Sequence, residues 1–397
     1  MASNSNNNIN IKSINSFSMT TTYYDSRKNP DLSLPQGGYH ESQTNEEKRE
    51  SISRDFRSDT VTAPTEAMFE FMKNASIGDD VYGEDLVTNQ FQDKMARLTG
   101  KEAAVFCVSG TMTNQLAIRT WLNQPPHSVL CDSRAHIHNY EAGGIAFFSQ
   151  ANTHPVIPSN GHSLTLEDIE PALVLTNDIH LAPTKLVCLE NTIAGLVHPQ
   201  EEISRISDRV HSLGLKMHCD GARIWEASAA TGLPISKLCE PFDSVSLCLS
   251  KGLGAPIGSI LVGPRELIEK VRWFRKMFGG GIRQCGSIVA AADYCLVHHF
   301  PRLAETHHLA KCLGNRLIQL GVKITIPIET NHVFIDPSPI GINIKELCAR
   351  AESLNIRIGG SRMIVHHQIN PKAIEGLLKL VEEMKEEVEA KSMNDKL

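Results

Sequence analysis

Three short polar segments each follow a run of apolar residues, and each has a different chemical capacity. Ser109-Gly110-Thr111 follows AAVFCV, Asp220-Gly221 follows KMHC, and Ser250-Lys251-Gly252 follows SVSLCL. A small glycine-containing turn that opens a helix presents free N–H groups to a phosphate, although the same residue types are also ordinary helix caps. A carboxylate can hold a neighbouring nitrogen protonated, and a lysine in a glycine-rich loop can attack a carbonyl carbon.

The elements that must position these segments are expected to be parallel β-strands. Six nearly continuous apolar runs have strand length, which is typical of strands covered on both faces: AAVFCVS, SVLCD, KLVCLE, KMHCD, SVSLCLS and SILVG. Helix-like segments such as Thr113–Leu122 and Ile203–Leu213 lie between them. The alternation predicts an α/β fold with a large doubly wound, mainly parallel sheet.

In such a sheet, ligands bind beyond the carboxyl ends of the strands, so the phosphate turn, the acid and the lysine are expected to meet there. Those are the three parts that a pyridoxal 5′-phosphate enzyme needs, for the cofactor's phosphate, ring nitrogen and aldehyde. The sequence therefore predicts this cofactor.

The chain divides into three predicted parts. Residues 1–54 form a polar, Ser/Asn-rich extension that is expected to be mostly disordered. Residues 55–304 form the large cofactor-binding domain, and 305–397 form a smaller α+β domain. In that last part NHVFID reads as a strand, and Pro371–Lys391 reads as an amphipathic helix capped by Asn370.

Composition excludes several classes of protein. The 397 residues carry 39 Lys+Arg and 45 Asp+Glu, a net charge of −6, so no basic surface for nucleic acid or an anionic membrane is expected. No apolar run reaches the ~18 residues of a transmembrane helix. The ten cysteines form no CxxC pair and mostly lie in apolar runs, which predicts buried, reduced thiols in a cytoplasmic protein.

Seven motifs, in order, resemble the low-specificity L-threonine aldolase family of fold-type-I pyridoxal-phosphate enzymes. They are FRSDTVTAPTEAM, GDDVYGED, VSGTMTNQ, AHIHNYEAGG, HCDGARIW, SLCLSKGLGAPIGS and RKMFGGGIRQ. The resemblance covers roughly residues 55–390. It implies cleavage of L-threonine and L-allo-threonine to glycine and acetaldehyde.

The resemblance also implies a catalytic set. Lys251 would form the Schiff base, Asp220 would pair with the pyridine nitrogen, and Arg223 would lie beside the ring's phenolic oxygen. His136 would stack on the ring near the substrate hydroxyl. Glu141 follows at the family's spacing and would orient a water or a proton relay.

Further binding residues follow from the same resemblance. Gly110 and Thr111 match the phosphate-binding turn. Ser58 and Arg362 match the groups that hold the substrate carboxylate. These four residues complete the part of the site expected from one subunit.

A neighbouring subunit is expected to contribute three more residues. Tyr82, Lys276 and Arg283 resemble residues that reach across an interface, the last two towards the phosphate. This implies a homo-oligomer with shared active sites, a homotetramer built as a pair of dimers or a homodimer.

One departure from the family pattern leaves a second activity open. The family often has Glu-Asn-Thr-His in a strand-end loop, where the histidine helps to bind the β-hydroxyl, but here Ile193 follows Glu190-Asn191-Thr192. Near Arg362, His366-His367 stands where Thr-His is common. Recognition of the hydroxyl would then fall more heavily on His136, or the substrate would lack a hydroxyl, as in the alanine racemases that share this architecture.

Two alternative functions belong to other classes of protein. The 17 histidines suggest a metal-dependent enzyme, but the clusters have no HExxH-like spacing, so no metal site is expected. A catalytically inactive relative kept for binding is disfavoured because Lys251, Asp220, His136 and Arg362 are all present.

Overall fold

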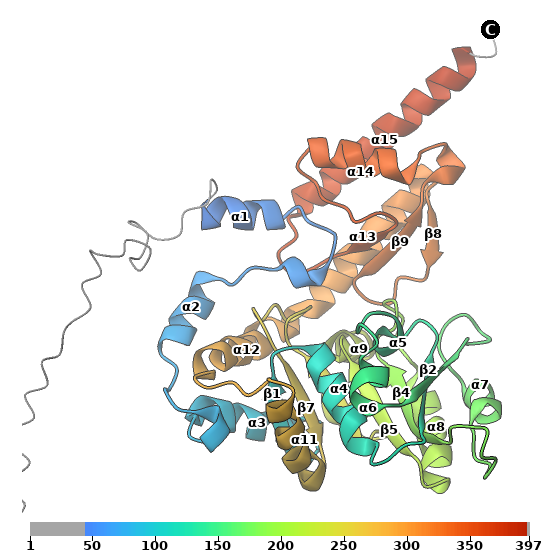
Figure 1. Ribbon diagram of the computed structural model, residues 1–397. Helices are drawn as coiled ribbons and strands as arrows, with labels where there is room; N and C mark the ends of the chain where they lie inside the picture. The colour runs from blue at the N-terminus through green and yellow to red at the C-terminus, as the bar shows by residue number, and fades with distance from the viewer. Residues whose placement is uncertain (1–43, 395–397) are drawn as a thin grey trace, which may run out of the picture. The chain divides into compact units, whose positions relative to one another are not determined.

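The computed structural model describes residues 44–394, and residues 49–394 belong to one compact unit (Figure 1). The predicted polar extension therefore lies, over residues 1–43, outside the described residues. Within the described part, α1 spans Asn45–Ile52.

The large sheet has seven strands in the order β1-β7-β6-β5-β4-β2-β3. The strands are β1 (Ala103–Cys107), β2 (Ser128–Asp132), β3 (Asn152–Val156), β4 (Thr184–Glu190), β5 (Lys216–Gly221), β6 (Ser244–Cys248) and β7 (Ser259–Gly263). Only β7 runs antiparallel to its two neighbours, β1 and β6. The α/β class with a mainly parallel sheet is thus confirmed, and the carboxyl ends of β1, β2, β4, β5 and β6 share one edge with the start of β7.

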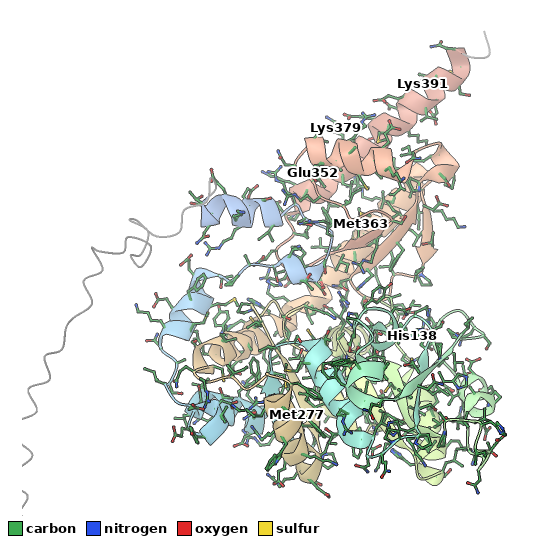
Figure 2. All side chains as sticks on the ribbon, viewed as in Figure 1. His138, Met277, Glu352, Met363, Lys379 and Lys391 are labelled. Atoms are coloured by element: carbon green, nitrogen blue, oxygen red, sulfur yellow. The ribbon has the colours of Figure 1, made fainter. Side chains whose placement is uncertain are left out.

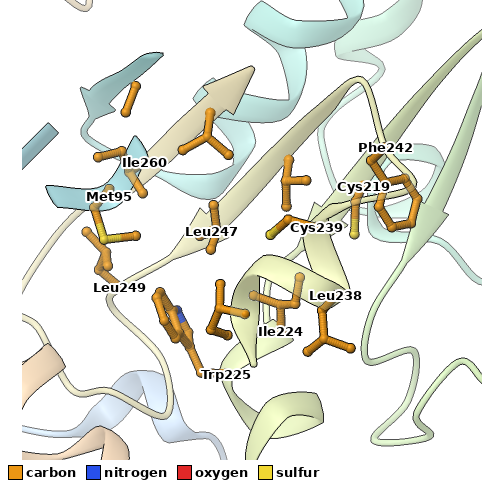
Figure 3. Packing of buried hydrophobic residues seen from close by; sticks show 14 of the residues in the cluster. Met95, Cys219, Ile224, Trp225, Leu238, Cys239, Phe242, Leu247, Leu249 and Ile260 are labelled. Carbon is orange, nitrogen blue, oxygen red and sulfur yellow. The ribbon is translucent and has the colours of Figure 1, made fainter. Parts of the chain in front are cut away.

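All six predicted apolar runs enter the sheet as mostly or fully buried strands, because they are covered on both faces. Successive residues point to opposite faces. Val105, Cys107 and Leu261 pack under α4 and α11, whereas Phe106 and Ile260 pack with Met95 of α3 on the other face. Figure 3 shows the packing on this other face of the sheet, where Leu247 and Ile260 lie near Met95.

The helices alternate with the strands and then build the C-terminal part. The α-helices are α2 (Glu66–Lys73), α3 (Leu86–Thr99), α4 (Gly110–Trp121), α5 (His136–Asn139), α6 (Gly144–Ser149), α7 (Leu166–Ile169), α8 (Gln200–Ser212), α9 (Ile224–Thr231), α10 (Ile235–Cys239), α11 (Arg265–Met277), α12 (Gly286–His298), α13 (Leu303–Leu320), α14 (Ile344–Ser353) and α15 (Pro371–Asn394). Short 3₁₀ helices are η4 (Asp59–Val61), η5 (Asp80–Tyr82), η6 (Glu170–Ala172), η7 (Phe300–Arg302) and η8 (Ser338–Ile340). The two segments expected to be helical correspond to α4 and α8.

The apolar pattern does not reveal strand β3. Its sequence, Asn152–Val156, is polar, contains Pro155 and is only partly buried. It pairs with β2 alone at the edge of the sheet, where a proline costs no interior hydrogen bond. Edge strands of this kind give no continuous apolar run.

A second, antiparallel sheet is built in the order β10-β9-β8 from β8 (Lys323–Ile326), β9 (His332–Asp336) and β10 (Arg362–Ile364). Helix α15 packs on this part through Ile374, Leu377 and Val381, and Asn370 caps it by accepting from the Lys372 N–H at 3.0 Å. Lys379 and Lys391 lie on the same helix in Figure 2.

The cysteines are free in the structure, and eight of the ten are buried. Among residues 44–394, no helix is long and apolar enough to cross a membrane.

A buried ion pair anchors the segment between α2 and α3 to α11. Arg275 donates to Asp80 Oδ2 at 2.6 Å and to the Phe106 carbonyl at 2.6 Å, and both charged side chains are almost fully buried. Removing one partner of such a pair leaves the other charge buried and uncompensated.

Asp80→Ala is therefore expected to lower the free energy of unfolding by about 3–5 kcal/mol, measured by denaturant titration. Glu240→Ala, which breaks the exposed Lys237–Glu240 pair, is the matched control and should leave the unfolding midpoint unchanged. An Asp80→Ala protein as stable as the parent would contradict this account of the anchor.

Candidate active site

The predicted residues gather at the edge of the large sheet where the parallel strands end. Ser109 follows β1, His136 opens α5 just after β2, and Lys251 follows β6. Glu190 and Asp220 end two adjacent strands and lie opposite each other in the register of β4 and β5. One edge thus carries the acid, the lysine, the histidine and the helix-opening turn.

A buried amide joins two of these carboxylates. Asn114 Nδ2, on α4, donates to Asp220 Oδ2 at 2.8 Å and to Glu141 Oε1 at 2.9 Å. Its carbonyl oxygen lies 3.1 Å from His218 Nε2, while His218 Nδ1 lies 2.9 Å from the Ser244 hydroxyl. Burial lowers the pKa of His218 to about 4, so the ring is neutral and its Nε2–H donates to Asn114.

Glu141 in turn holds His136. The carboxylate lies 2.9 Å from His136 Nδ1 and accepts from Gln115 Nε2 at 2.6 Å. The hydrogen bond to Glu141 raises the pKa of His136 against the opposing effect of burial, and the Asp220 charge adds to the rise. The Nδ1–H is therefore fixed on Glu141, which leaves Nε2 as the nitrogen that can exchange a proton.

Glu190 supports His136 through the main chain. Its Oε2 accepts from the His136 N–H at 2.8 Å. Burial, together with the nearby Asp220 charge, raises the pKa of Glu190 to about 8. At neutral pH the proton therefore resides mostly on Glu190.

Arg223 is held by an acid that sequence reasoning missed. Its guanidinium donates to both oxygens of Asp59, at 2.6 and 2.9 Å. Burial would raise the pKa of Asp59, but the Arg223 charge outweighs it and holds the pKa below its usual range. Ser58 lies beside this pair and accepts from the Thr60 N–H at 3.2 Å.

Arg362 stands exposed at the start of β10, and its only hydrogen bond within the described chain is a long one, 3.5 Å to the Arg57 carbonyl. The guanidinium is therefore available to a ligand. Its neighbour His332, at the start of β9, is buried, and burial lowers its pKa well below the usual range. The charges of Lys251 and Arg362 also act on His332.

The space around Lys251 suits the predicted cofactor. Lys251 is half-buried and acts electrostatically on Asp59 and Glu190. Nearby, Ser109 caps α4, whose first N–H groups have no acceptor inside the helix. The buried Ser259 hydroxyl has no hydrogen-bond partner among the described residues and lies 3.5 Å from the point where a Cβ of Gly110 would be. A phosphate would find donors here, so the residues fit the group.

A metal ion fits the same place less well. Ligand atoms of His136, Glu141 and Asp220 lie within 4.8 Å of one another. However, Glu141 already accepts from Asn114 and Gln115, and Asp220 accepts from Asn114 and from the Ala222 N–H. These oxygens face hydrogen-bond donors, which repel a cation.

The three residues expected to act across an interface are exposed. Tyr82 is 76% exposed at the end of η5, and Arg283 pairs with Asp79, the residue that caps η5, at 2.9 Å. Lys276, at the end of α11, lies near Gly281 and is exposed. Within residues 44–394, no hydrogen bond or ion pair connects these three side chains to Lys251.

The loop that departs from the family pattern has a histidine packed on it from another element. Ile193 is buried, and its N–H donates to the Leu196 carbonyl at 3.1 Å. Two residues on, a Cβ at Gly195 would lie 2.6 Å from the Cβ of His332. His332 was missed because a histidine inside an apolar strand reads as ordinary core.

Comparisons with known proteins identify the family and the fold. Residues 55–338 match the beta-eliminating lyase family. A low-specificity L-threonine aldolase of Saccharomyces cerevisiae is 46% identical over 327 residues, 82% of this chain and 84% of the relative. An alanine racemase of Cochliobolus carbonum is 38% identical over 332 residues, 82% and 85% of the two chains. The Leishmania major threonine aldolase structure superposes with a TM-score of 0.70 at 21% identity, covering 84% of this chain and 99% of that one.

Fold and site together define a fold-type-I pyridoxal-phosphate enzyme. The chain belongs to the beta-eliminating lyase family, in its low-specificity L-threonine aldolase group, as the seven motifs predict.

Glu141→Gln is expected to lower the pKa of His136, because the carboxylate contact is the largest cause of its rise. If His136 must be neutral to accept a proton, the rate rises with pH through this pKa. The rising limb of the pH profile of kcat/KM should then move to a lower pH by about half a pH unit to one pH unit. His138→Gln, at the exposed neighbour labelled in Figure 2, is the control and should leave the profile unchanged. A limb that stays in place in Glu141→Gln would contradict the coupling.

Proposed function

We propose that this protein is a pyridoxal-phosphate-dependent aldolase that cleaves L-threonine and L-allo-threonine to glycine and acetaldehyde. The observation that carries the proposal is the convergence of Lys251, Asp220 and His136 on one sheet edge, with Asp220 and the His136 partner Glu141 joined by Asn114. The identity to the yeast aldolase supports it.

Lys251 would hold the cofactor, which would supply a sink for the electron pair left at Cα when a bond to that carbon breaks. Asp220 would pair with the ring nitrogen and hold a proton on it. Gly110 and Thr111 would hold the phosphate through the start of α4, and Arg223, held by Asp59, would lie beside the ring.

The residues that bind the substrate select the bond that breaks and accept the proton of the substrate hydroxyl. The free guanidinium of Arg362, with Ser58, holds the substrate carboxylate and thereby orients the Cα–Cβ bond. His136 accepts the hydroxyl proton as the Cα–Cβ bond breaks and the aldehyde leaves. A proton delivered to Cα then completes glycine.

A second candidate activity is alanine racemisation. The specific observations that favour it are the 38% identity to an alanine racemase and the buried, apolar Ile193 in place of a histidine. The higher identity to the yeast aldolase favours cleavage.

Separate incubation of the holoenzyme with L-threonine, L-allo-threonine and L-alanine distinguishes the two activities. The proposal expects glycine and acetaldehyde from both threonines, since Ile193 cannot hydrogen-bond the hydroxyl and His136 must sense it in either configuration. Rapid D-alanine formation without glycine from either threonine would overturn the aldolase proposal.

Lys251→Ala is expected to abolish turnover and the visible absorption band of the holoenzyme, because the proposal assigns the attachment of the cofactor to Lys251 alone. Borohydride treatment followed by mass spectrometry should add the cofactor mass to the parent protein but not to the variant. Lys270→Ala, at an exposed lysine of α11, serves as the control and should label like the parent. Labelling of Lys251→Ala at another residue would refute the assignment.

We also infer a homo-oligomer, a homotetramer or a homodimer, in which Tyr82, Lys276 and Arg283 complete the site of a neighbouring subunit. The supporting observation is that all three are exposed, and that α11, which carries Lys276, also exposes Trp273 and Met277, by 81% and 64%. The eight buried thiols are consistent with a reducing compartment, and we propose the cytoplasm.

Mixed subunits test the shared site. Lys251→Ala and Arg283→Ala should each have little activity alone. After dissociation and reassembly, the mixture should regain up to about one quarter of the parent activity, since about half of the dimers are hybrids and one of the two sites in each hybrid is intact. Failure to regain activity in proven hybrids, or full activity of a monomer, would count against a shared site.

A further inference from the structure

Buried ionisable side chains surround the loop that follows Lys251, and the proposed mechanism uses none of them. A Cβ added to Gly252 would overlap Glu226 Oε1, a carboxylate oxygen from α9. A Cβ added to Gly254, where φ is +77°, would lie 2.5 Å from His367 Cε1. The space that a side chain would need at each glycine is thus already filled by a side chain from another element.

Glu226 is held beneath the loop by one strong contact. Its Oε2 lies 2.5 Å from His307 Nε2 of α13, and both side chains are buried. Burial raises the pKa of Glu226, and the His307 hydrogen bond opposes that rise. Asp59 and Arg223 are the other charged groups that act on it.

The second carboxylate oxygen makes this placement unusual. Glu226 Oε1 has no hydrogen-bond partner among the described residues, although an unpaired buried polar atom costs free energy. The same oxygen lies over Gly252. The oxygen therefore fills a recess that exists only because residue 252 has no side chain.

The other side of the loop is held by a pair of histidines. His299 Nδ1 lies 2.7 Å from the Leu253 carbonyl, and the His299 ring lies 4.4 Å from the His367 ring. Burial lowers the pKa of His367 to about 3, so that ring is neutral. Residues 252, 253 and 254 are thus each contacted by a different side chain, immediately after the lysine.

We propose that Glu226, held by His307, is a positioning residue that fixes the Lys251 loop through steric contact with Gly252. The proposal rests on the proposed function in one respect, that Lys251 is the lysine to which the cofactor attaches. Its consequence is that Glu226 controls cofactor affinity without touching cofactor or substrate.

A steric double-mutant cycle tests the contact. Pyridoxal phosphate is titrated into apoprotein while the visible absorption band is followed, and kcat for L-threonine is measured on the saturated enzyme. Gly252→Ala should weaken cofactor binding about tenfold or more, because the new methyl group displaces the Glu226 carboxyl. Gly252→Ala/Glu226→Ala, which removes that carboxyl, should bind at least about threefold more tightly than Gly252→Ala alone.

Five single variants separate the effect of side-chain shape from that of charge and from general damage to the fold. Glu226→Gln keeps the shape of the side chain and should retain cofactor affinity within about threefold, whereas Glu226→Ala should weaken it. Gly359→Ala is the matched glycine control, because its Cβ would meet Arg57 at an ordinary 3.6 Å, and it should bind like the parent. His308→Gln, at the exposed neighbour of His307, should also bind like the parent, whereas His307→Ala should weaken binding.

The positioning role would be overturned if the losses of cofactor affinity from the two single variants added up in the double variant. Equal losses of cofactor affinity in Glu226→Gln and Glu226→Ala would also overturn it. Should Gly252→Ala fail to fold by circular dichroism, the comparison of Glu226→Gln with Glu226→Ala decides alone. Cofactor affinity is read without substrate, so a protein that shows this binding pattern but cleaves no threonine defeats the proposed function and not this inference.

Discussion

The side-chain amide of Asn114 is the contact on which the arrangement of the site depends. One NH₂ group donates to Asp220 and to Glu141, so two buried carboxylates from separate elements are held around a single nitrogen. Without that donor, the two buried carboxylates would lose a hydrogen bond each and would repel one another. The amide thus keeps the acid expected to face the ring nitrogen in a fixed relation to the carboxylate that orients His136.

The sheet explains why these groups can meet at all. Parallel strands end at one edge, so a residue placed after each apolar run arrives there regardless of its distance along the chain. The charges are then balanced locally: Asp59 neutralises Arg223, Glu190 holds a proton, and the buried His218 stays neutral. Asp220 is left as the carboxylate that the proposed chemistry places against the ring nitrogen.

The sequence allowed the site residues that follow apolar runs to be predicted, but it did not reveal the side chains that contact them. The positions of Lys251, Asp220 and the turn at Ser109 follow from strand patterning, because burial on both faces leaves a continuous apolar signal. Asp59 lies about 160 residues from the arginine it binds, and nothing in its local sequence indicates that contact. Glu226 reads as an ordinary helical residue, and only the three-dimensional packing places it over Gly252. The polar edge strand β3 was missed because it is not covered on both faces.

The charge on Asp220 is the central element of this account, and Asp220→Asn tests it most directly. The amide keeps the shape and can still occupy the same place, but it cannot hold a positive charge on the ring nitrogen. The account predicts that Asp220→Asn still takes up pyridoxal phosphate while kcat for L-threonine cleavage falls by about 10²-fold or more, in line with the loss of a preorganised charge contact. Parent-like kcat in a fully loaded Asp220→Asn enzyme would contradict it.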